Sequence, residues 1–141
     1  MTGYSDDEMT SENLEIVRKM YERREAGDMY VGEYIHPEIE FARFGSEAPD
    51  FTGEWRGIEG LRQATVEYLN VWEDYRFEVE RMVDLGDRVL VLEKQTARGR
   101  RSGAVISQDV GAILTLEDGL IVRWEYYWER ADALEAAGVE N

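Results

Sequence analysis

The chain has 141 residues, of which 31 are acidic and 16 basic, and its formal net charge is -15. This length fits one domain, and 43% apolar and 11% aromatic residues supply a core, so the high charge does not indicate disorder. The acidic balance argues against nucleic acid and against an anionic membrane surface, because both partners require a basic protein surface. The absence of cysteine excludes disulfides, thiolate metal sites and thiol nucleophiles. No run of eighteen apolar residues occurs, so we expect a cytoplasmic protein.

The first half of the chain predicts helices and one strand. Apolar residues recur at helical spacing over Ser11–Ala26, and Gly27 follows where a left-handed C-terminal cap belongs. A second, short helical piece is expected over Asp28–Ile35, ending before Pro37 because the residue that precedes proline avoids the helical region. Apolar and polar residues then alternate over Glu38–Phe44, which is the period of a strand.

The second half predicts a loop, one helix and a meander of strands. The stretch Gly45–Arg56 has loop composition, and Gly57 opens a helix that reaches Trp72. Four further stretches have strand character: Tyr75–Leu85, Arg88–Arg98, Ala104–Glu117 and Leu120–Arg130. Asp118-Gly119 is a strong hairpin signal, and a helical turn over Ala131–Ala137 closes the chain.

This order of elements predicts an α+β fold with the helices grouped on one face of a mostly antiparallel sheet. Long strands covered on one face twist and curl, so we expect a cone with a concave, mostly apolar interior. Residues 11–141 are expected to form this single domain, and residues 1–10 a flexible N-terminal tail.

Four motifs resemble those of the nuclear transport factor 2-like superfamily, a cone-shaped α+β fold that includes ketosteroid isomerase, scytalone dehydratase and the SnoaL-like polyketide cyclases. They are EAGD at Glu25–Asp28, HPEIEF at His36–Phe41, GIEGLR at Gly57–Arg62 and DGLIVRWEYYWERADALEAAG at Asp118–Gly138. The resemblance covers nearly the whole chain and implies the fold; it implies less about function, because this fold carries many unrelated activities.

The acid and base positions that the resemblance implies are changed in this chain. The general base of the isomerase falls at Arg43, which stays protonated at ordinary pH. Its oxyanion tyrosine falls at Met20, and the second acid, which is also the cyclase aspartate, falls near Ala112. Whether the chain is an enzyme is therefore left open, and no transfer of isomerase or cyclase activity is supported.

A strand period of two assigns the side chains that point into the cone. The expected inward residues are Ile39, Phe41 and Arg43, then Gln108, Val110, Ala112 and Leu114, and finally Val122, Trp124, Tyr126 and Trp128. A slip of one residue would turn Asp109 inward in place of Gln108 and make Asp109 a candidate general base.

Arg43 is the most informative of these residues, because a charge on an apolar inward face needs a partner or a ligand. One interpretation is that it binds an anionic or carbonyl-bearing ligand through its paired N–H groups. The alternatives are an internal ion pair with Glu93 or Glu125, or a side chain that reaches solvent at the rim.

The remaining candidates for the ligand pocket are mainly aromatic. Tyr126 could stack on a planar ligand and donate a hydrogen bond, with Trp124 and Trp128 beside it, although aromatic residues at this spacing are more often ordinary core. Gln108 could orient a carbonyl, or it could be a polar residue near a strand end. Phe41 and Met20 complete the expected pocket.

Metal and cofactor chemistry is not expected. The single histidine, His36, precedes a proline at an element junction and has no partner pattern, so a structural role is favoured. The carboxylates show no metal-ligand spacing with it, and no cofactor motif is present.

The outer face of the sheet predicts a homodimer. Ile121, Arg123, Glu125 and Tyr127 on the last strand, and Ile113 and Thr115 on the third long one, are too apolar a set for a whole solvated face. Superfamily members commonly pair through this face, which implies a two-fold dimer with matched Arg123 and Glu125 contacts.

Two functional hypotheses follow. The first is a small-molecule-binding protein, and more specifically a cofactor-independent enzyme of the isomerase, cyclase, dehydratase or hydrolase type that acts on a hydrophobic carbonyl compound. The second is a non-catalytic binding or dimeric assembly module whose cavity is filled by its own side chains. The partner of Arg43 and the volume of the interior distinguish them.

Overall fold

A computed structural model describes residues 11–29, 31–45 and 52–140. The expected flexible tail, residues 1–10, and most of the expected loop before Thr52 lie outside the described residues. The elements are α1 (Glu12–Glu25), a 3-10 turn η2 (Gly32–Tyr34), β1 (Ile35–Phe44), β2 (Gly53–Arg56), α2 (Gly57–Val71), β3 (Trp72–Asp84), β4 (Arg88–Gly99), β5 (Val105–Glu117), β6 (Leu120–Tyr127) and α3 (Arg130–Ala137).

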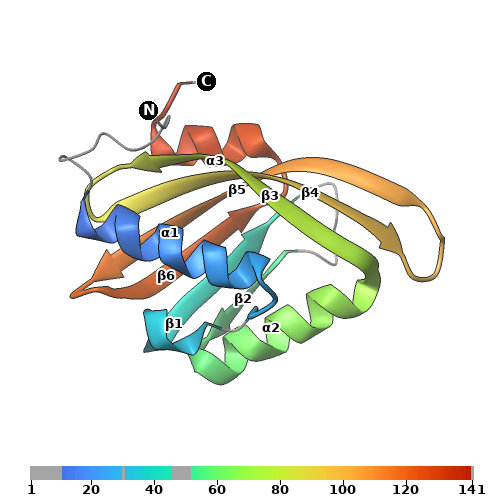
Figure 1. Cartoon of the computed structure of the whole chain (residues 1–141), viewed down its shortest axis with the longest axis horizontal. Coiled ribbons are helices and arrows are strands. Elements are labelled where there is room, and N and C mark those ends of the chain that lie inside the picture. The colour runs from blue at the N-terminus through green and yellow to red at the C-terminus, as the bar shows by residue number, and fades with distance from the viewer. Residues whose placement is uncertain (1–10, 30, 46–51, 141) are drawn as a thin grey trace.

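A twisted six-stranded sheet forms the middle of the molecule, with α1 and α2 on its concave face (Figure 1). The α+β class, the strand meander and the curled sheet are therefore as expected. The first helix begins as the sequence indicates, because the Ser11 hydroxyl accepts a hydrogen bond from the Leu14 amide at 3.0 Å.

The strand order is β2-β1-β6-β5-β4-β3, so the first and last long strands are neighbours. They pair in parallel, while the other neighbours are antiparallel. This pairing sets Phe41 opposite Trp124 and Arg43 opposite Tyr126. Residues more than eighty positions apart in the sequence thus meet on one face.

Several of the expected boundaries were wrong, most of them in the first half of the chain. The second helical piece is only the 3-10 turn η2, and β1 begins at Ile35, so that Pro37 lies inside a strand. The β1–β6 register is irregular between Ile35 and Glu40, which accommodates the missing proline amide. The expected loop also contains a short strand, β2, which pairs with β1.

A β-bulge in the last hairpin corrects the inward set. Leu116 pairs with Ile121 and Thr115 pairs with Arg123, so Val122 is the extra residue on β6. Ile121 therefore points into the inner core and is fully buried, where the strict alternation predicts Val122. From Trp124 onward the expected inward face is correct.

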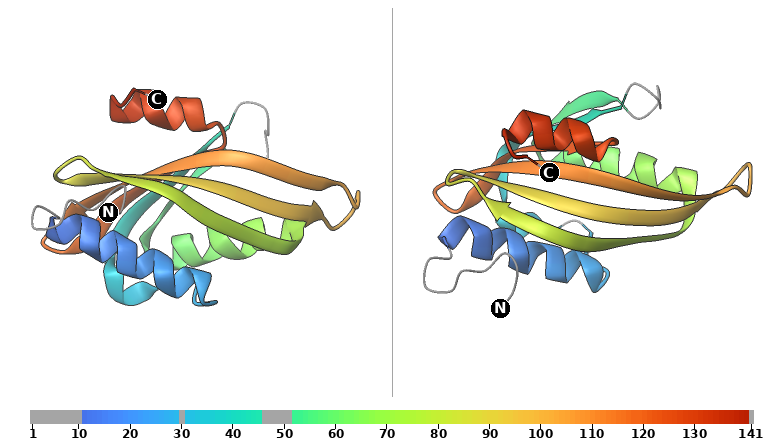
Figure 2. Two further views of the ribbon diagram at one scale, coloured as in Figure 1. Left: turned by 45° about the horizontal axis from the view of Figure 1, so that its top comes forward. Right: turned by 90° about the horizontal axis from the view of Figure 1, so that it is seen from above.

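The third helix corrects the prediction that all helices lie on one face. Figure 2 shows α3 on the opposite side of the sheet from α1 and α2. Its Ala133 and Leu134 pack against an outer cluster that includes Ile113 and Tyr127. The apolar outer residues that predict a dimer are thus covered within the chain.

Gly111 on β5 allows this close approach. A Cβ atom at this position would lie 2.5 Å from the Cβ of Ala133, which is closer than two carbon atoms pack. A Cβ atom is fixed to its backbone and cannot rotate away, so either the helix or the strand would have to move.

We expect Gly111→Ala to lower the free energy of unfolding by about 1–3 kcal/mol, the usual penalty of overpacking, although alanine is the better strand residue. Urea unfolding measures the change. Gly32→Ala is the matched control, since a Cβ there meets nothing within 4 Å. Equal midpoints for both variants and the unchanged protein would contradict this account of α3.

Candidate functional site

A cavity of about 50 Å³ lies between the concave face of the sheet and helices α1 and α2. Its lining is aromatic and apolar, with two guanidinium groups: Arg24, Met29, Phe41, Arg43, Leu61, Ala64, Thr65, Tyr68, Leu69, Tyr75, Trp124 and Tyr126. This volume holds one or two waters or a compact group of a ligand.

The cavity continues outward into a groove of about 660 Å³ at the end of α1. Both spaces share Arg24, Met29, Leu69 and Tyr75. The groove is further lined by charged residues of α1 and β3, among them Glu25, Arg76 and Glu78. A molecule too large for the cavity would therefore extend into this groove.

Arg43 reaches the cavity from β1 and is only 5% exposed, which excludes the alternative that it extends to solvent. Its guanidinium lies 4.4 Å from the ring centre of Trp55 and 5.3 Å from that of Tyr68. Its Nη1 atom donates to the Ala64 carbonyl at 3.5 Å. Burial lowers the pKa of Arg43, and nearby Tyr68 and Glu67 oppose that shift.

The two carboxylates expected as internal partners of Arg43 are placed elsewhere. Glu125 lies on the outer face and pairs with Arg123 at 3.3 Å. Glu93 lies deeper in the cone, near Arg24 and Tyr21.

A hydrogen-bonded network crosses the cavity wall. The Tyr126 hydroxyl donates to Gln95 Oε1 at 2.9 Å, and Gln95 Nε2 donates to the Tyr68 hydroxyl at 2.7 Å. Gln95 is fully buried, so this network fixes both tyrosines in place. Burial raises the pKa of Tyr68 to about 12 and that of Tyr126 well above its usual value.

A second polar group lies at the inner end of the cone. The Arg24 guanidinium lies over the rings of Tyr21, Phe77 and Trp124. Glu93 on β4 is 1% exposed, and burial raises its pKa, while Arg24 and Tyr21 partly oppose the shift. Burial lowers the pKa of Arg24, but Tyr21 and Glu93 outweigh it and the net shift is upward.

Four of the residues predicted for the pocket line the cavity: Phe41, Arg43, Trp124 and Tyr126. Three do not. Gln108 points inward, with Asp109 exposed, but its amide donates to the Trp128 carbonyl at 2.8 Å. Met20 and Trp128 pack in the inner core away from the cavity.

Sequence reasoning missed Tyr68, Gln95 and the position of Arg24. A signal existed for Gln95, since a polar residue on the inward face of a central strand needs partners. Both faces of β4 are apolar over Val89–Leu92, however, so alternation does not identify the inward face. Tyr68 and Arg24 lie on helices, whose rotation about their axes the strand register does not fix.

The remaining sequence candidates are placed as follows. The ring of His36 accepts a hydrogen bond from the Glu38 amide at 2.9 Å, which is a local backbone contact. Within residues 11–29, 31–45 and 52–140, no group of three or more histidine, aspartate and glutamate side chains could hold a metal ion. In the same ranges, no helix is long and apolar enough to cross a membrane.

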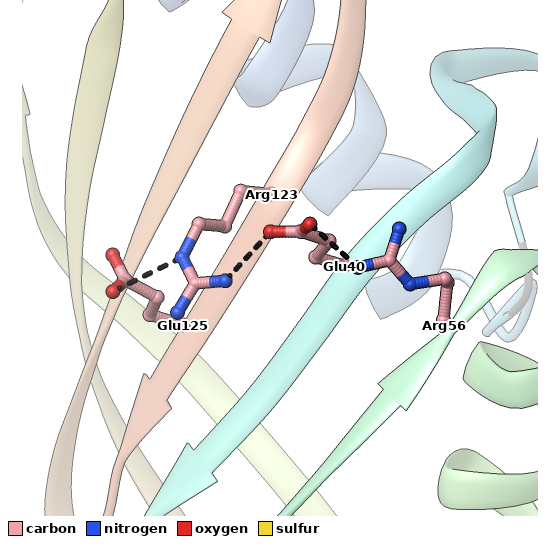
Figure 3. Close-up of polar contacts among 4 residues, drawn as sticks. All are labelled: Glu40, Arg56, Arg123 and Glu125. Atoms are coloured by element: carbon pink, nitrogen blue, oxygen red, sulfur yellow. Dashed lines mark hydrogen bonds and ion pairs between the residues drawn. The ribbon is translucent and has the colours of Figure 1, made fainter.

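The outer face of the sheet carries a row of alternating charges on β2, β1 and β6 (Figure 3). Arg56 pairs with Glu40 at 3.0 Å, Glu40 with Arg123 at 2.9 Å, and Arg123 with Glu125 at 3.3 Å. Arg123 and Glu125 thus have partners within the chain.

These features define a cone-shaped α+β protein with an aromatic, arginine-bearing cavity. The chain belongs to the SnoaL-like domain family, whose model matches residues 17–124. No curated protein matches it.

Solved structures confirm the fold. An NTF2-like protein from Burkholderia thailandensis E264 is 22% identical, with a TM-score of 0.75 over 94% of this chain and 100% of that chain. A candidate SnoaL-like polyketide cyclase from Jannaschia sp. CCS1 is 17% identical, with a TM-score of 0.74 over 99% and 100%. TerC, crystallised with polyporic acid, is 21% identical, with a TM-score of 0.73 over 91% and 99%.

We expect Tyr68 to make the fold sensitive to alkali. Its pKa is about 12 in the fold and about 10 in the unfolded chain, so the unfolded chain loses its proton first as the pH rises. The stability that this difference contributes is complete below pH 10 and declines until about pH 12. Between pH 9 and pH 11.5, Tyr68→Phe should lose about 2 kcal/mol less unfolding free energy than the unchanged protein.

Urea unfolding across this pH range measures the difference. Tyr34→Phe, which removes a hydroxyl outside the cavity lining, is the control. Parallel declines in Tyr68→Phe and the unchanged protein would show that Tyr68 is not buried as described.

Proposed function

We propose that this SnoaL-like protein binds a small molecule through a carbonyl or anionic oxygen that enters the cavity beside Arg43. The observation that carries the proposal is a buried guanidinium that lies over the rings of Trp55 and Tyr68 and lines the cavity. A guanidinium presents five N–H donors in a planar fork, which matches the geometry of carboxylate and carbonyl oxygens.

Tyr68 supplies a further donor group for the same oxygen. Tyr68 and Tyr126 line the cavity, and burial keeps both hydroxyls protonated at neutral pH. Tyr126 donates its O–H to Gln95, whereas Tyr68 accepts from Gln95 and carries its own O–H at the cavity wall. Gln95 thus fixes the positions of both tyrosines before a ligand arrives. An oxygen that gains negative charge during a reaction would be stabilised by this donor set.

The size of the cavity sets the shape of the ligand. About 50 Å³ holds a compact carbonyl or carboxylate group, and the apolar remainder would lie in the adjoining groove. One structural neighbour was crystallised with polyporic acid and another is named a candidate polyketide cyclase. Polyporic acid and polyketides both carry carbonyl groups, which supports the same class of ligand.

If a reaction occurs, it is of the cofactor-independent isomerase, cyclase, dehydratase or hydrolase type on a hydrophobic carbonyl compound. In each, Arg43 and Tyr68 would polarise the carbonyl. The sequence suggests Tyr126 as this donor, but the Tyr126 hydroxyl donates to Gln95. Gln108 is not proposed to position the ligand, because its amide donates to the Trp128 carbonyl. Gln95 acts instead, since it holds the tyrosines of the cavity wall in place.

The alternative is a non-catalytic module whose cone is filled by its own side chains. The small volume of the inner cavity favours it. Ligand binding distinguishes the two, since a filled cone has no site for which Arg43 matters.

We expect the chain to bind benzoate, a carboxylate on an aromatic ring, more tightly than neutral benzyl alcohol. Arg43→Ala should weaken benzoate binding at least tenfold and Tyr68→Phe severalfold, because each removes a donor to the carboxylate. Calorimetry measures the affinities, and native mass spectrometry of the purified chain searches for a bound small molecule.

The matched control is Arg62→Ala, which removes an exposed arginine of α2. The ligand site would be wrong if benzoate does not bind, or if Arg43→Ala and Arg62→Ala weaken its binding equally. Either result would favour the filled cone.

We further propose that two copies pair through the charged row of the outer face. A two-fold axis perpendicular to this row of charged groups would set Arg56 opposite Glu125 and Glu40 opposite Arg123, so the row is complementary to itself. This replaces the apolar contact expected from Ile113 and Tyr127, which α3 covers.

Light scattering in dilute salt should give twice the chain mass of 16.4 kDa. Arg123→Glu should shift the mass to one chain, because it places like charges opposite each other. Lys94→Glu, a charge reversal elsewhere on the sheet, is the control. A mass of about 16.4 kDa for the unchanged protein would refute the dimer.

A further inference from the structure

Three aromatic rings form a cage around the side chain of Arg24. The guanidinium carbon lies 5.2 Å from the ring centre of Tyr21, 5.1 Å from that of Phe77 and 5.1 Å from that of Trp124. Ring faces carry negative potential, so several of them around one point attract a cation. Cages of this kind hold alkylated ammonium groups as well as guanidinium groups.

A buried carboxyl group completes the negative surroundings. Glu93 is 1% exposed on β4, and its charge acts on both Arg24 and Tyr21. Among the described residues, however, no ion pair within 4 Å joins Glu93 to a cation. Glu93 Oε2, Arg24 Nε and the Tyr21 hydroxyl are buried without a hydrogen-bond partner of normal geometry.

Arg24 therefore fills the cage but forms no ion pair with Glu93. A well-fitted internal arginine would use its N–H groups on the carboxylate, as buried ion pairs do. Here the ring faces hold the guanidinium, while Glu93 Oε2 and Arg24 Nε make no hydrogen bond of normal geometry. A smaller cation is not tied to a helix and could approach Glu93 directly.

The Arg24 side chain could also lie in the neighbouring groove. Arg24 lines both the inner cavity and the open groove, in which Glu25 and Glu78 are exposed. Rotation of its flexible side chain would bring the guanidinium among these carboxylates. The charge of Arg24 would then be compensated outside the cone while the cage is vacated.

We propose that the cage of Tyr21, Phe77, Trp124 and Glu93 is a binding site for a compact organic cation of the alkylammonium or guanidinium class, which displaces Arg24 into the groove. The net charge of -15 favours such a ligand, because it raises the concentration of cations near the entrance. Arg24 and Trp124 line the same cavity as Arg43, but the cation site does not depend on the oxygen-binding role of Arg43.

Tetramethylammonium and ethylguanidinium chlorides are suitable probes. Neutral tert-butanol, of similar bulk to tetramethylammonium, and sodium chloride at equal ionic strength are the controls. Binding is followed in the unchanged protein by the indole N–H resonance of Trp124, which Trp124→Phe assigns among the four tryptophans, and in all variants by the thermal midpoint.

The unchanged protein should bind both cations saturably and should not respond to tert-butanol. Arg24→Ala should bind them at least tenfold more tightly, because no side chain has to be displaced. Glu93→Gln should weaken binding at least tenfold in either background, whereas Arg62→Ala, which removes an exposed arginine of α2, should leave it unchanged.

Several outcomes would overturn the site. One is no saturable response of the unchanged protein; another is the same response to tert-butanol as to the cations. Binding by Arg24→Ala alone would show that Arg24 is a permanent part of the core. If Arg24→Ala fails to fold, the unchanged protein and Glu93→Gln still decide the question. Failure here with intact benzoate binding would leave the proposed function standing.

Discussion

The parallel pairing of β1 with β6 is the contact on which the architecture depends. It joins a strand from the first third of the chain to the last strand, and it closes the concave side of the sheet. Without it, β1 and β2 would have no place in the sheet, and Arg43 would not lie opposite Tyr126. Because such long-range pairing carries a large entropic penalty, apolar contacts on both sides must stabilise it. The Phe41–Trp124 ring contact on the inner face and the Phe44–Tyr127 stack on the outer face do so, with centroids 5.8 and 5.0 Å apart.

This arrangement separates stability from binding. Apolar packing is supplied twice, by an inner cluster under α1 and by an outer cluster under α3. The inner face therefore tolerates Arg43, Glu93 and Gln95 among its buried residues, although none of them is a favourable core residue on transfer grounds. Replacing such groups by apolar residues of similar volume is often neutral or stabilising, so their presence favours a role other than stability. The apolar burial in the outer cluster offsets the stability that these polar residues remove from the inner face.

Strand period and turn signals predict much of this structure, and the misses have particular causes. Alternation places Phe41, Arg43, Trp124 and Tyr126 on the inward face, where they line the cavity, because one register is kept along both strands. It fails at Ile121, where a bulge adds a residue that no local signal marks. The helical turn over Ala131–Ala137 is predicted, but its place on the outer face is not, because its alanine-rich face needs a partner surface that exists only once β4 and β5 are paired. Both Arg24 and Tyr68 face the cavity because of the rotation of their helices, which depends on packing across the whole sheet.

The distribution of charge restricts which ligands the cone accepts. Within the described part of the chain, two guanidinium groups line the cavity, and one carboxyl is buried behind it. The exterior is strongly acidic, so an anion is repelled at a distance and attracted only within a few ångströms of Arg43. A neutral carbonyl compound meets no such barrier and still gains the hydrogen bonds of Arg43 and Tyr68. A cation is attracted at long range but must compete with Arg24 for the cage. The acidic exterior thus lowers the affinity for an anionic oxygen without removing the advantage that contact with Arg43 gives it, and added salt raises that affinity by screening the exterior.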